Sequence, residues 1–356
     1  MRDSVQRLFV SDAHNLRECI AVLDRTGKGI VLAVDEGGRL LGTITDGDIR
    51  RAILDRIDLS VAVRTLLDGK ANSAYPRPIT APVGADHKTL VTLMKRHAVR
   101  QLPLLDDAGR VVDLVTLDEL LPDQPLPVQV VIMAGGRGSR LRPLTDTLPK
   151  PMLPIGDRPV MEFIIEQLRQ AGIRRVHITT HYHAEKITEH FGNGQGFGVE
   201  INYVAEDRPL GTAGAISLMK KPQEPLLVIN ADVLTQVNYR ALVAHHRKHK
   251  ADLTVAVRRY DLELPYGIVE CEGPLVRELR EKPSLGFLVN AGIYLLEPSI
   301  LKYLPEGQRF DMTELIQVLL ANGHRVVGFP IVEYWLDIGR LADYEKAQED
   351  LKERGE

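Results

Sequence analysis

The chain has 356 residues, of which 44% are hydrophobic and 26% charged, and its formal net charge is −3. This composition is typical of a globular protein with room for two or three domains. Nothing in the charge suggests binding to nucleic acid or to a membrane surface, and no apolar stretch is long enough to span a bilayer. No signal pattern opens the chain, so we expect a cytoplasmic protein with neither nucleic acid nor a membrane as partner. The two cysteines, Cys19 and Cys271, form no disulfide framework or zinc motif, and we expect both to be small core residues.

The first third of the chain is internally duplicated. At a constant offset of 71 residues and without gaps, identical residues recur, among them Arg25 and Arg96, Asp35 and Asp106, Gly38 and Gly109, Arg39 and Arg110, and Thr45 and Thr116. Each copy shows a helical stretch, a short apolar strand, an acidic Gly-Arg turn and a second strand. The pattern predicts two similar α/β units, at about residues 1–60 and 72–121.

The most specific piece of this repeat is Gly42–Arg50, which reads GTITDGDIR. The duplicated helix–strand–turn–strand–helix unit resembles a tandem pair of CBS domains, known as a Bateman module. The resemblance implies a regulatory site for an adenine or other nucleotide, with Thr45 and Asp48 holding the ribose and the nearby phosphate region and Thr116 as their counterpart. The second copy departs from the pattern, because Glu119 replaces the aspartate. Thr45 and Asp48 are equally explained as caps of the following helix, in which case the module serves only in assembly.

A proline-rich segment, residues 122–127, separates this module from the rest of the chain. Its sequence PDQPLP has three prolines in six residues, which cannot continue a helix or a central strand and which stiffen a linker. We therefore expect the module to end at residue 121 and a second domain to occupy residues 128–356.

The second half opens with an apolar run that leads into a glycine-rich loop, reading VVIMAGGRGSRLRPL. Glycines let the backbone turn tightly and bring its N–H groups close to an anion. Arg140 and Lys150 add two cations beside the loop. The pattern therefore predicts a polyphosphate cradle, formed by Ala134, Gly135, Gly136 and Gly138. The loop is neither a Walker loop nor a dinucleotide fingerprint, because Gly-Lys-Ser/Thr and the third-glycine spacing are missing.

Short apolar strands alternate with amphipathic helices from here to the end, which predicts a largely parallel, doubly wound sheet. The expected strands are Gln129–Met133, Val176–Thr180, Glu200–Val204, Leu226–Asn230, Leu253–Val257, Ala291–Leu296 and Val326–Phe329. The expected helices are Val160–Ala171, Ala184–Phe191, Gly214–Met219, Tyr239–His249, Met312–Asn322 and Leu341–Lys352. Ligands of such sheets bind at the carboxyl ends of the strands, where the glycine loop would lie.

Two aspartates stand where a metal ligand is expected. Asp232 follows the strand that ends at Asn230, and Asp337 lies in the segment WLDIG. Because Mg²⁺ takes one or two carboxylates together with substrate phosphates, these two suffice for a magnesium site. The small residues of GTAGA, beginning with Gly211 and Thr212, permit a flat base to lie against the backbone.

A second polar set follows later in the chain. It consists of Gly267, Glu281, Lys282 and Asn290. A lysine suits a monoester phosphate, while glutamate and asparagine suit sugar hydroxyls. Two histidine groups, around His181 and around His246, invite a metal interpretation, but no third ligand is identifiable, and we expect them on a solvated surface.

The ordered motifs of the second half resemble those of sugar-1-phosphate nucleotidyltransferases, from Val128 to the end of the chain. The resemblance implies a Rossmann-like, mostly parallel sheet. It also implies a reaction in which a sugar 1-phosphate attacks the α-phosphorus of a nucleoside triphosphate and releases pyrophosphate. By family position, Arg140 would grip the β- and γ-phosphates and Lys150 would bridge the nucleophile and the α-phosphate. Asp232 and Asp337 would hold Mg²⁺.

The resemblance also implies where the two substrates lie. Gly211 and Thr212 would line the base pocket, and the set that begins with Gly267 and ends with Asn290 would hold the sugar phosphate. Ala-Gly-Gly with Leu-Gly-Thr-Ala-Gly-Ala is similar to mannose-1-phosphate guanylyltransferases. The fusion to a CBS pair resembles the glucosamine-1-phosphate guanylyltransferases of legionaminic acid pathways.

We therefore expect GTP as the nucleotide, a homo-oligomer, and a product that feeds cell-surface glycan or nonulosonic acid synthesis. UTP or dTTP with glucose 1-phosphate is the alternative. Two alternatives from another functional class are a CBS-based nucleotide sensor and an assembly scaffold, each with an inactive transferase half. The occupied charge positions, such as Arg140 and Lys150, favour the enzyme.

Overall fold

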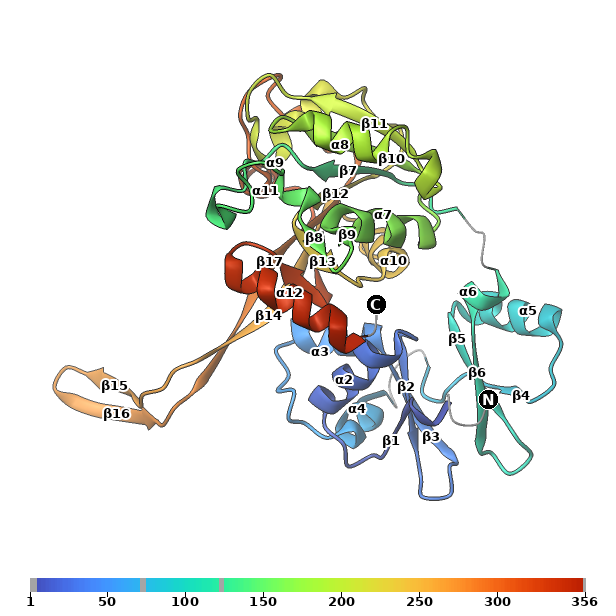
Figure 1. Cartoon of the computed structure of the whole chain (residues 1–356). Coiled ribbons are helices and arrows are strands. Elements are labelled where there is room, and N and C mark those ends of the chain that lie inside the picture. The colour runs from blue at the N-terminus through green and yellow to red at the C-terminus, as the bar shows by residue number, and fades with distance from the viewer. Residues whose placement is uncertain (1–4, 71–74, 122–124, 355–356) are drawn as a thin grey trace.

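The computed structural model describes residues 5–70, 75–121 and 125–354 (Figure 1). In the first copy of the repeat, α2 (Leu16–Thr26) is followed by β2 (Ile30–Val34), β3 (Leu40–Thr45), α3 (Asp46–Leu54) and α4 (Val63–Gly69). In the second copy, α5 (His87–His97) precedes β5 (Gln101–Leu105), β6 (Val111–Thr116) and α6 (Leu117–Leu120). The first helix and both strands of each copy are offset by the predicted 71 residues. A short strand completes each three-stranded sheet, β1 (Phe9–Val10) in one and β4 (Ala81–Pro82) in the other.

The two copies contact each other through their equivalent turns. Arg39 and Arg110 form an antiparallel bridge, and the N–H of Leu40 donates to the carbonyl of Gly109 at 3.2 Å. Residues 122–124 of the predicted linker lie outside the described residues. Among the described helices, none is long and apolar enough to cross a membrane.

A seven-stranded sheet forms the centre of the C-terminal part, in the order β11-β10-β7-β12-β17-β14-β18. These strands are β7 (Gln129–Met133), β10 (Arg175–Thr180), β11 (Glu200–Ala205), β12 (Leu226–Asn230), β14 (Leu253–Glu263), β17 (Ser284–Leu296) and β18 (Val326–Ile331). All pairings are parallel except those of β17, which runs antiparallel to both β12 and β14. The predicted doubly wound, mostly parallel sheet is confirmed.

Helices cover both faces of this sheet, and each face has its own core. One core joins the strands to α7 (Val160–Gln170), α8 (Ala184–Phe191) and α10 (Tyr239–Lys248). The other joins them to α11 (Met312–Ala321) and the 3₁₀ segment Pro298–Tyr303. The predicted helix Gly214–Met219 is instead a one-turn helix, α9 (Gly211–Gly214), that continues as a 3₁₀ turn.

Strands β14 and β17 are longer than predicted and continue beyond the sheet as a two-stranded ribbon. Their pairing runs out to Glu263 opposite Ser284. Beyond it, β15 (Ile268–Glu272) and β16 (Leu275–Arg280) form a separate hairpin. Figure 1 shows this ribbon and hairpin projecting away from both parts of the molecule. We call residues 260–288 the arm.

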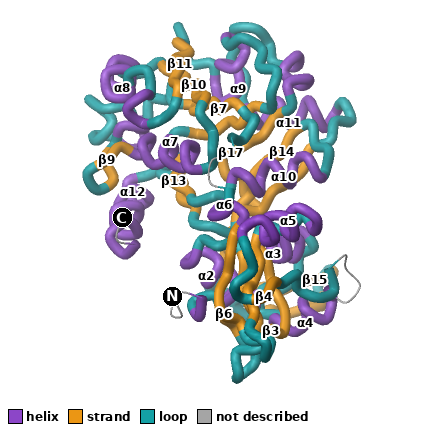
Figure 2. The backbone as a smooth tube through the Cα atoms, turned by 90° about the vertical axis from the view of Figure 1, so that its right-hand side faces the viewer, coloured by secondary structure: helices purple, strands orange, loops and turns teal. Residues whose placement is uncertain are grey.

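The N-terminal part packs against the edge strand β18 through helix α3. Figures 1 and 2 both show α3 beside the lower end of the C-terminal part. The guanidinium of Arg50, only 4% exposed, lies 4.0 Å from the centre of the Phe329 ring and donates to Glu333 Oε1 at 2.8 Å and to the carbonyl of Pro330. Burial opposes the charge of Arg50, but Glu333 and Asp46 outweigh it and raise the pKa of Arg50. We call this contact the α3 junction.

Two sequence expectations about single residues are wrong. Cys19 is buried as expected, but Cys271 is exposed, because it lies on the arm. His246 is 1% exposed and bonds Thr254 Oγ1 at 2.7 Å and Glu297 Oε1 at 3.1 Å, so it belongs to the core and not to a solvated face.

Candidate active site

The glycine loop follows the carboxyl end of β7, and hydrogen bonds with Thr179 and Thr145 hold it in place. The N–H of Ala134 donates to the hydroxyl of Thr179 at 3.1 Å. Gly138 has φ +61°, and a Cβ there would lie 3.0 Å from Lys150 Cβ and from Thr145 Cγ2. Thr145 in turn donates from its hydroxyl to the carbonyl of Gly138 at 2.9 Å. Only glycine fits this position, which brings the loop against the segment that carries Lys150.

A cavity of about 200 Å³ opens over this loop. It is lined by Met133, Ala134, Gly136, Gly138, Ser139, Arg140, Lys150, Pro151, Ala231 and Asp232. Strands β7 and β12 are parallel neighbours, so their carboxyl ends meet at one edge of the sheet and bring the loop and Asp232 together. The structure therefore joins the predicted phosphate cradle, both predicted cations and one predicted metal ligand.

Lys150 and Asp232 form an ion pair inside this cavity. Lys150 Nζ lies 2.5 Å from Asp232 Oδ2, and the Lys150 side chain is 12% exposed. The other carboxylate oxygen, Asp232 Oδ1, is buried and has no hydrogen-bond partner. A buried carboxylate oxygen without a partner is costly unless a cation or donor meets it.

Asp337 stands beside this pair because of a short strand pairing. Strand β13 (Val233–Thr235) runs antiparallel to β19 (Trp335–Asp337), and Val233 lies opposite Asp337. Burial of the Asp337 carboxyl raises its pKa, and the neighbouring charge of Asp232 raises it further. Lys150 and Arg140 act in the opposite direction, and the net pKa remains raised.

These two carboxylates fit a divalent cation. Both are oxygen ligands of the kind that Mg²⁺ prefers, and substrate phosphates usually complete its coordination. The unpartnered Oδ1 of Asp232 and the mutual repulsion of the two carboxylates are what a cation between them would relieve. Among the described residues, no group of three or more His, Cys, Asp or Glu side chains is placed to hold a metal.

Glu206 is a buried carboxylate beside the glycine loop that the sequence reasoning missed. It follows β11, is 7% exposed, and its Oε2 accepts from the N–H of Leu210 at 2.9 Å. Its Oε1 would lie 2.4 Å from a Cβ at Gly135. A buried carboxylate thus lies between the glycine loop and the loop that begins with Gly211. A lone glutamate carries no spacing signal, which is why the sequence did not reveal it.

Gly211 and Thr212 are fixed by the N-terminus of α11. Gly211 has φ +79°, and a Cβ there would meet Asp311 Oδ1 at 2.5 Å. The N–H of Thr212 donates to the same oxygen at 3.0 Å, and the Thr212 hydroxyl accepts from the N–H of Met312 at 2.9 Å. This loop is therefore rigid, and it follows Glu206 at the same edge of the sheet as the glycine loop.

The predicted sugar-phosphate residues are divided between the sheet and the arm. Asn290 lies on β17 and donates to the hydroxyl of Tyr294 at 2.7 Å. The pKa of that hydroxyl is raised by burial, with Asp232 among the charges that add to the shift, so Asn290 belongs to the site's surroundings. Gly267, Glu281 and Lys282 lie instead on the exposed arm, outside the cavity that Lys150 lines. The length of β14 and β17 carries them past the sheet, and their role in sugar-phosphate binding stays a prediction.

Comparison with known proteins decides the family. A family model described as nucleotidyl transferase matches residues 129–354. The chain belongs to this nucleotidyl transferase family. A CBS domain model matches residues 2–55 and 74–122, in agreement with the duplicated N-terminal part.

Curated members of the nucleotidyl transferase family match the same part of the chain. A mannose-1-phosphate guanylyltransferase of Mycobacterium tuberculosis is 34% identical over 232 residues, covering 63% of this chain and 64% of the relative. A UTP–glucose-1-phosphate uridylyltransferase of Synechocystis is 34% identical over 244 residues, covering 62% of each. A D-glycero-α-D-manno-heptose 1-phosphate guanylyltransferase of Aneurinibacillus thermoaerophilus is 36% identical, covering 63% of this chain and 99% of the relative. The match thus spans a little under two thirds of the first two relatives.

Solved structures of the nucleotidyl transferase fold agree. HddC from Yersinia pseudotuberculosis, complexed with GMP-PN, superposes with a TM-score of 0.51 at 25% identity, covering 64% of this chain and all of that chain. A UDP-glucose pyrophosphorylase complexed with UDP-glucose gives the same TM-score at 22% identity, which supports the fold alone.

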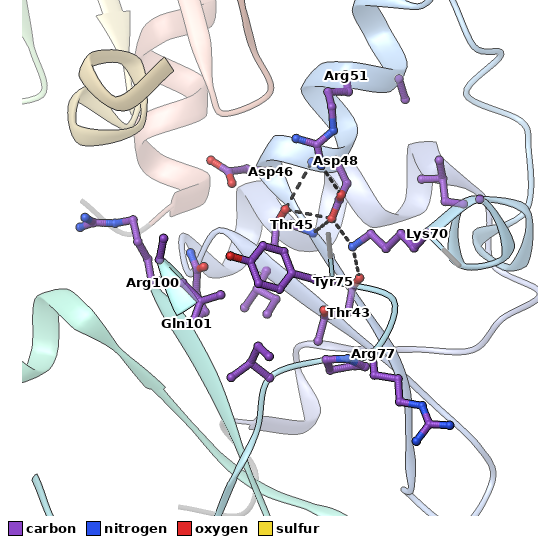
Figure 3. A pocket seen from close by; sticks show the side chains of 18 of the residues that line it. Thr43, Thr45, Asp46, Asp48, Arg51, Lys70, Tyr75, Arg77, Arg100 and Gln101 are labelled. Carbon is purple, nitrogen blue, oxygen red and sulfur yellow. Dashed lines mark hydrogen bonds and ion pairs between the residues drawn. The ribbon is translucent and has the colours of Figure 1, made fainter. Parts of the chain in front are cut away.

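The CBS pair contains a second and larger cavity of about 760 Å³ (Figure 3). Its wall includes Thr45, Asp48, Lys70 and Gln101 from the two copies, together with Lys248 from α10 of the nucleotidyl transferase part. The CBS pair alone therefore does not complete this cavity.

The Asp48 carboxylate already has hydrogen-bond and ion-pair partners within the CBS pair. Thr45 caps α3, with a reciprocal capping box to Asp48, so both residues have the capping role that the sequence allowed, and their role toward a nucleotide stays a prediction. Lys70 Nζ and Arg51 Nη2 each lie 2.5 Å from a carboxylate oxygen of Asp48 (Figure 3). Burial opposes ionisation of Asp48, but Lys70, Thr45 and Arg51 prevail and lower its pKa. Thr116 likewise caps α6, and its box partner Glu119 pairs with Lys28 of the first copy at 2.6 Å.

Proposed function

We propose that this protein is a sugar-1-phosphate nucleotidyltransferase that uses GTP. It would join GTP and a hexose 1-phosphate into a GDP-sugar and release pyrophosphate. Mannose 1-phosphate and glucosamine 1-phosphate are the favoured sugars. The cluster of Arg140, Lys150, Asp232 and Asp337 around one cavity supports the reaction class.

The charges of this cluster account for the chemistry. The nucleophile, a sugar phosphate, is already an anion, so no general base is required. Lys150 would neutralise charge on the attacking and α-phosphates, and Arg140 would orient the outer phosphates of the triphosphate. The Gly135 loop would place backbone N–H groups against the same phosphates. Mg²⁺, when held by Asp232 and Asp337, would supply charge neutralisation at the α-phosphate.

The observation that favours GTP is the placement of Glu206. Guanine presents two adjacent donors, N1–H and the exocyclic N2–H₂, and a carboxylate is an acceptor for both. Uracil and thymine present a single ring N–H between two carbonyls, which a carboxylate would repel. A carboxylate held at Gly135 and Leu210 therefore suits guanine over uracil or thymine. Two relatives named as guanylyltransferases support the same choice.

A substrate panel tests this proposal. GTP, UTP, dTTP and ATP would each be combined with mannose, glucosamine and glucose 1-phosphates and Mg²⁺, and pyrophosphate release measured. We expect release with GTP to exceed release with the others. Preferential use of UTP or dTTP with glucose 1-phosphate would replace the guanylyl assignment by the uridylyl or thymidylyl alternative. Release with none would contradict the reaction class.

We propose a second function, regulation by a nucleotide bound in the CBS cavity. The observation that favours it is that helix α3 contacts both the CBS cavity and the nucleotidyl transferase part. Asp48 of α3 lines the cavity, and Arg50 two residues later makes the α3 junction with Glu333. Glu333 lies four residues before Asp337 on the same segment. A ligand that draws Lys70 or Arg51 away from Asp48 would thus act on α3. The α3 junction fixes this helix to the segment that carries Asp337.

Ligand binding to the full chain tests this second function. We expect AMP or ATP, without sugar phosphate, to raise the thermal unfolding midpoint of the wild-type protein, and we expect Asp48→Ala to reduce that rise. Lys150→Ala serves as the control, because it removes triphosphate binding at the active site but leaves the CBS cavity intact. A shift that disappears in Lys150→Ala and persists in Asp48→Ala would assign the nucleotide to the active site alone.

A further inference from the structure

The four charged residues that we assign to the reaction come from four different segments, and these segments share one small buried cluster. The charged residues are Arg140, Lys150, Asp232 and Asp337. Each is followed, one to three positions later, by an apolar residue of the cluster that is at most 7% exposed, and these are Leu141, Leu153, Leu234 and Ile338. The cluster is separate from the two cores on the faces of the seven-stranded sheet. The relative positions of the charged residues therefore depend on how this cluster is closed.

Helix α12 (Leu341–Arg354) covers this cluster with one apolar face. Ala347 and Leu351, which are 0% and 7% exposed, belong to the cluster, and Tyr344 packs against it. These three residues are spaced by three and four positions, so they lie on the same face of the helix. Through this face α12 lies against both β19 and β8 (Pro154–Ile155) (Figure 1). One helix therefore contacts the strand that ends at Asp337 and the strand that follows Lys150.

Two polar side chains of α12 hold the backbone that follows Lys150. Gln348 Nε2 donates to the carbonyl of Pro154 at 2.7 Å, and Gln348 Oε1 accepts from the N–H of Gly156 at 3.0 Å. The Tyr344 hydroxyl donates to the same Pro154 carbonyl at 2.5 Å. An amide has a donor end and an acceptor end, so only one orientation of Gln348 satisfies both backbone groups.

The same helix is also fixed to the segment that carries Asp337. Three residues before Asp337, the Tyr334 hydroxyl donates to Asp350 Oδ2 of α12 at 2.6 Å. On the other side, Gly156 has φ +63°, and a Cβ there would lie 3.1 Å from Leu351 Cδ2, so the turn after β8 approaches the helix closely. Helix α12 thus connects the segment of Lys150 to the segment of Asp337.

We propose that Gln348 is a positioning residue of the active site, and that it fixes the Lys150 segment relative to the Asp337 segment through the backbone of Pro154 and Gly156. The inference rests on the proposed function, because that function assigns Lys150 and Asp337 to the reaction. Apolar contacts are non-directional, whereas hydrogen bonds at both ends of an amide fix where the backbone lies along the helix. Gln348 is not among the residues that line the cavity, so it acts through these contacts.

The exposure of the two backbone groups separates this role from a contribution to stability. Pro154 and Gly156 are exposed, so water can replace the amide at both groups when Gln348 is removed. The apolar face of α12 stays in place, and the fold should lose little. The position of Lys150 is then less strictly defined, and a misplacement of about 1 Å in an active site costs about 100-fold in rate.

Pyrophosphate release by the full chain tests the proposal. We expect Gln348→Leu to lower kcat by about 10–100-fold, with the thermal midpoint and the KM for the nucleotide unchanged, because α11 and not α12 holds the Gly211 loop. The matched control is Gln170→Leu, an exposed glutamine of α7, which should keep wild-type kcat. Wild-type kcat in Gln348→Leu, a loss confined to KM, or a loss of kcat that comes with a lower thermal midpoint would overturn the proposal.

A milder variant keeps the test decisive if Gln348→Leu does not fold. Tyr344→Phe keeps the ring against the apolar cluster and removes one of the two side-chain donors to the Pro154 carbonyl. We expect kcat to fall in the same direction by a smaller factor, again without a change in the thermal midpoint. Wild-type kcat in Tyr344→Phe would then overturn the proposal.

Acetylation of Lys150 needs no substrate and therefore distinguishes failure of this proposal from failure of the proposed function. The Lys150 side chain is 12% exposed and paired with Asp232, whereas Lys302 is exposed. We expect acetic anhydride to modify Lys150 slowly relative to Lys302 in the wild type, and the ratio of the two rates, read by mass spectrometry, to rise in Gln348→Leu. This rise in a protein without turnover would contradict the proposed function and support the positioning role. An unchanged ratio would overturn the positioning role, whatever the turnover.

Discussion

Lys150 Nζ lies 2.5 Å from Asp232 Oδ2, so the cation that we assign to the α-phosphate and the carboxylate that we assign to the metal form one ion pair. Each holds the other in place in the cavity that we propose for the triphosphate and Mg²⁺. In that proposal, the triphosphate would give Lys150 a new anionic partner, and Mg²⁺ would give Asp232 a new cationic partner. The site is therefore arranged in advance, as electrostatic stabilisation requires.

Removal of the lysine charge should abolish most turnover. We expect Lys150→Ala to lower kcat by about 10²–10³, because one charge-stabilising group in a preorganised site contributes on this order. Steady-state pyrophosphate release measures the change. Lys302→Ala, a lysine on the far 3₁₀ segment, is the control and should retain wild-type turnover. Near-normal turnover of Lys150→Ala would remove this residue from the mechanism.

The two carboxylates should share the work of holding the cation. We expect Asp337→Asn to shift the Mg²⁺ dependence of turnover to higher concentration, because one of two carboxylate ligands is lost. Glu349→Gln, an exposed carboxylate further along the following helix α12 (Leu341–Arg354), is the control. A Mg²⁺ titration with identical midpoints for wild type and Asp337→Asn would show that Asp337 is no ligand.

Glu206 should determine the choice of base. We expect Glu206→Gln to lower kcat/KM for GTP by about 10–100-fold, since an unpaired donor in a desolvated site costs about 1–3 kcal/mol. Its kcat/KM for UTP should stay level or rise, because repulsion of the uracil carbonyls is removed. The glutamine oxygen can still accept from the N–H of Leu210. The exposed neighbour in Asp207→Asn should change neither value, and an unchanged GTP preference in Glu206→Gln would contradict this role.

The α3 junction should contribute to the stability of the whole protein. Arg50→Ala would leave Glu333 and Asp46, which are 16% and 18% exposed, without their shared cation. Removing one partner of a buried ion pair costs about 3–5 kcal/mol, so we expect a clear fall in the thermal midpoint. Arg64→Ala, whose side chain is 72% exposed in its pair with Asp12, should cost less than about 1 kcal/mol. Equal midpoints for the two variants would show that the junction contributes little.

The same junction should be sensitive to acid through His245. Burial lowers the pKa of His245 to about 4, and the nearby charges of His249, Arg50 and Lys248 add to this shift. Because the unfolded value is about 6.5, the folded state favours the neutral ring. Its contribution to stability is complete above pH 6.5 and is lost as the pH falls toward 4.

Thermal midpoints measured between pH 7.5 and 4.5 check this effect. We expect the midpoint of His245→Gln to fall less over this range than that of the wild type, since glutamine does not titrate. His87→Gln, an exposed histidine of the second CBS copy, should follow the wild type. Parallel curves for all three proteins would contradict the assignment.

The sequence predicted features that rest on regular spacing. The 71-residue offset returns in α2 with α5, β2 with β5 and β3 with β6. The buried strands were recognisable from their apolar runs, and strand order explains why the segments after β7 and β12 meet. Gly138 was predicted as part of a tight glycine turn, and its φ of +61° agrees with such a turn.

Other features depend on contacts between distant residues, which spacing does not encode. The role of Glu206 becomes apparent only from its closeness to Gly135 in the fold. His246 has a basic local sequence, but Thr254 and Glu297 bury it. The arm was not predicted because apolar and charged residues are mixed along residues 260–288, and only the register of β15 with β16 separates them into two faces. Because the arm was not predicted, the position of Lys282 outside the cavity was not predicted either.

The fate of the α-phosphate of GTP tests the central claim most directly. The full-length protein would be incubated with Mg²⁺, mannose 1-phosphate or glucosamine 1-phosphate, and GTP labelled with ³²P at either the α- or the γ-position. We predict that the α-label moves into a GDP-sugar while the γ-label is recovered in pyrophosphate. If the α-label stayed in GTP, or appeared only in GDP or GMP without sugar, the proposed attack of a sugar phosphate on the α-phosphorus would be contradicted.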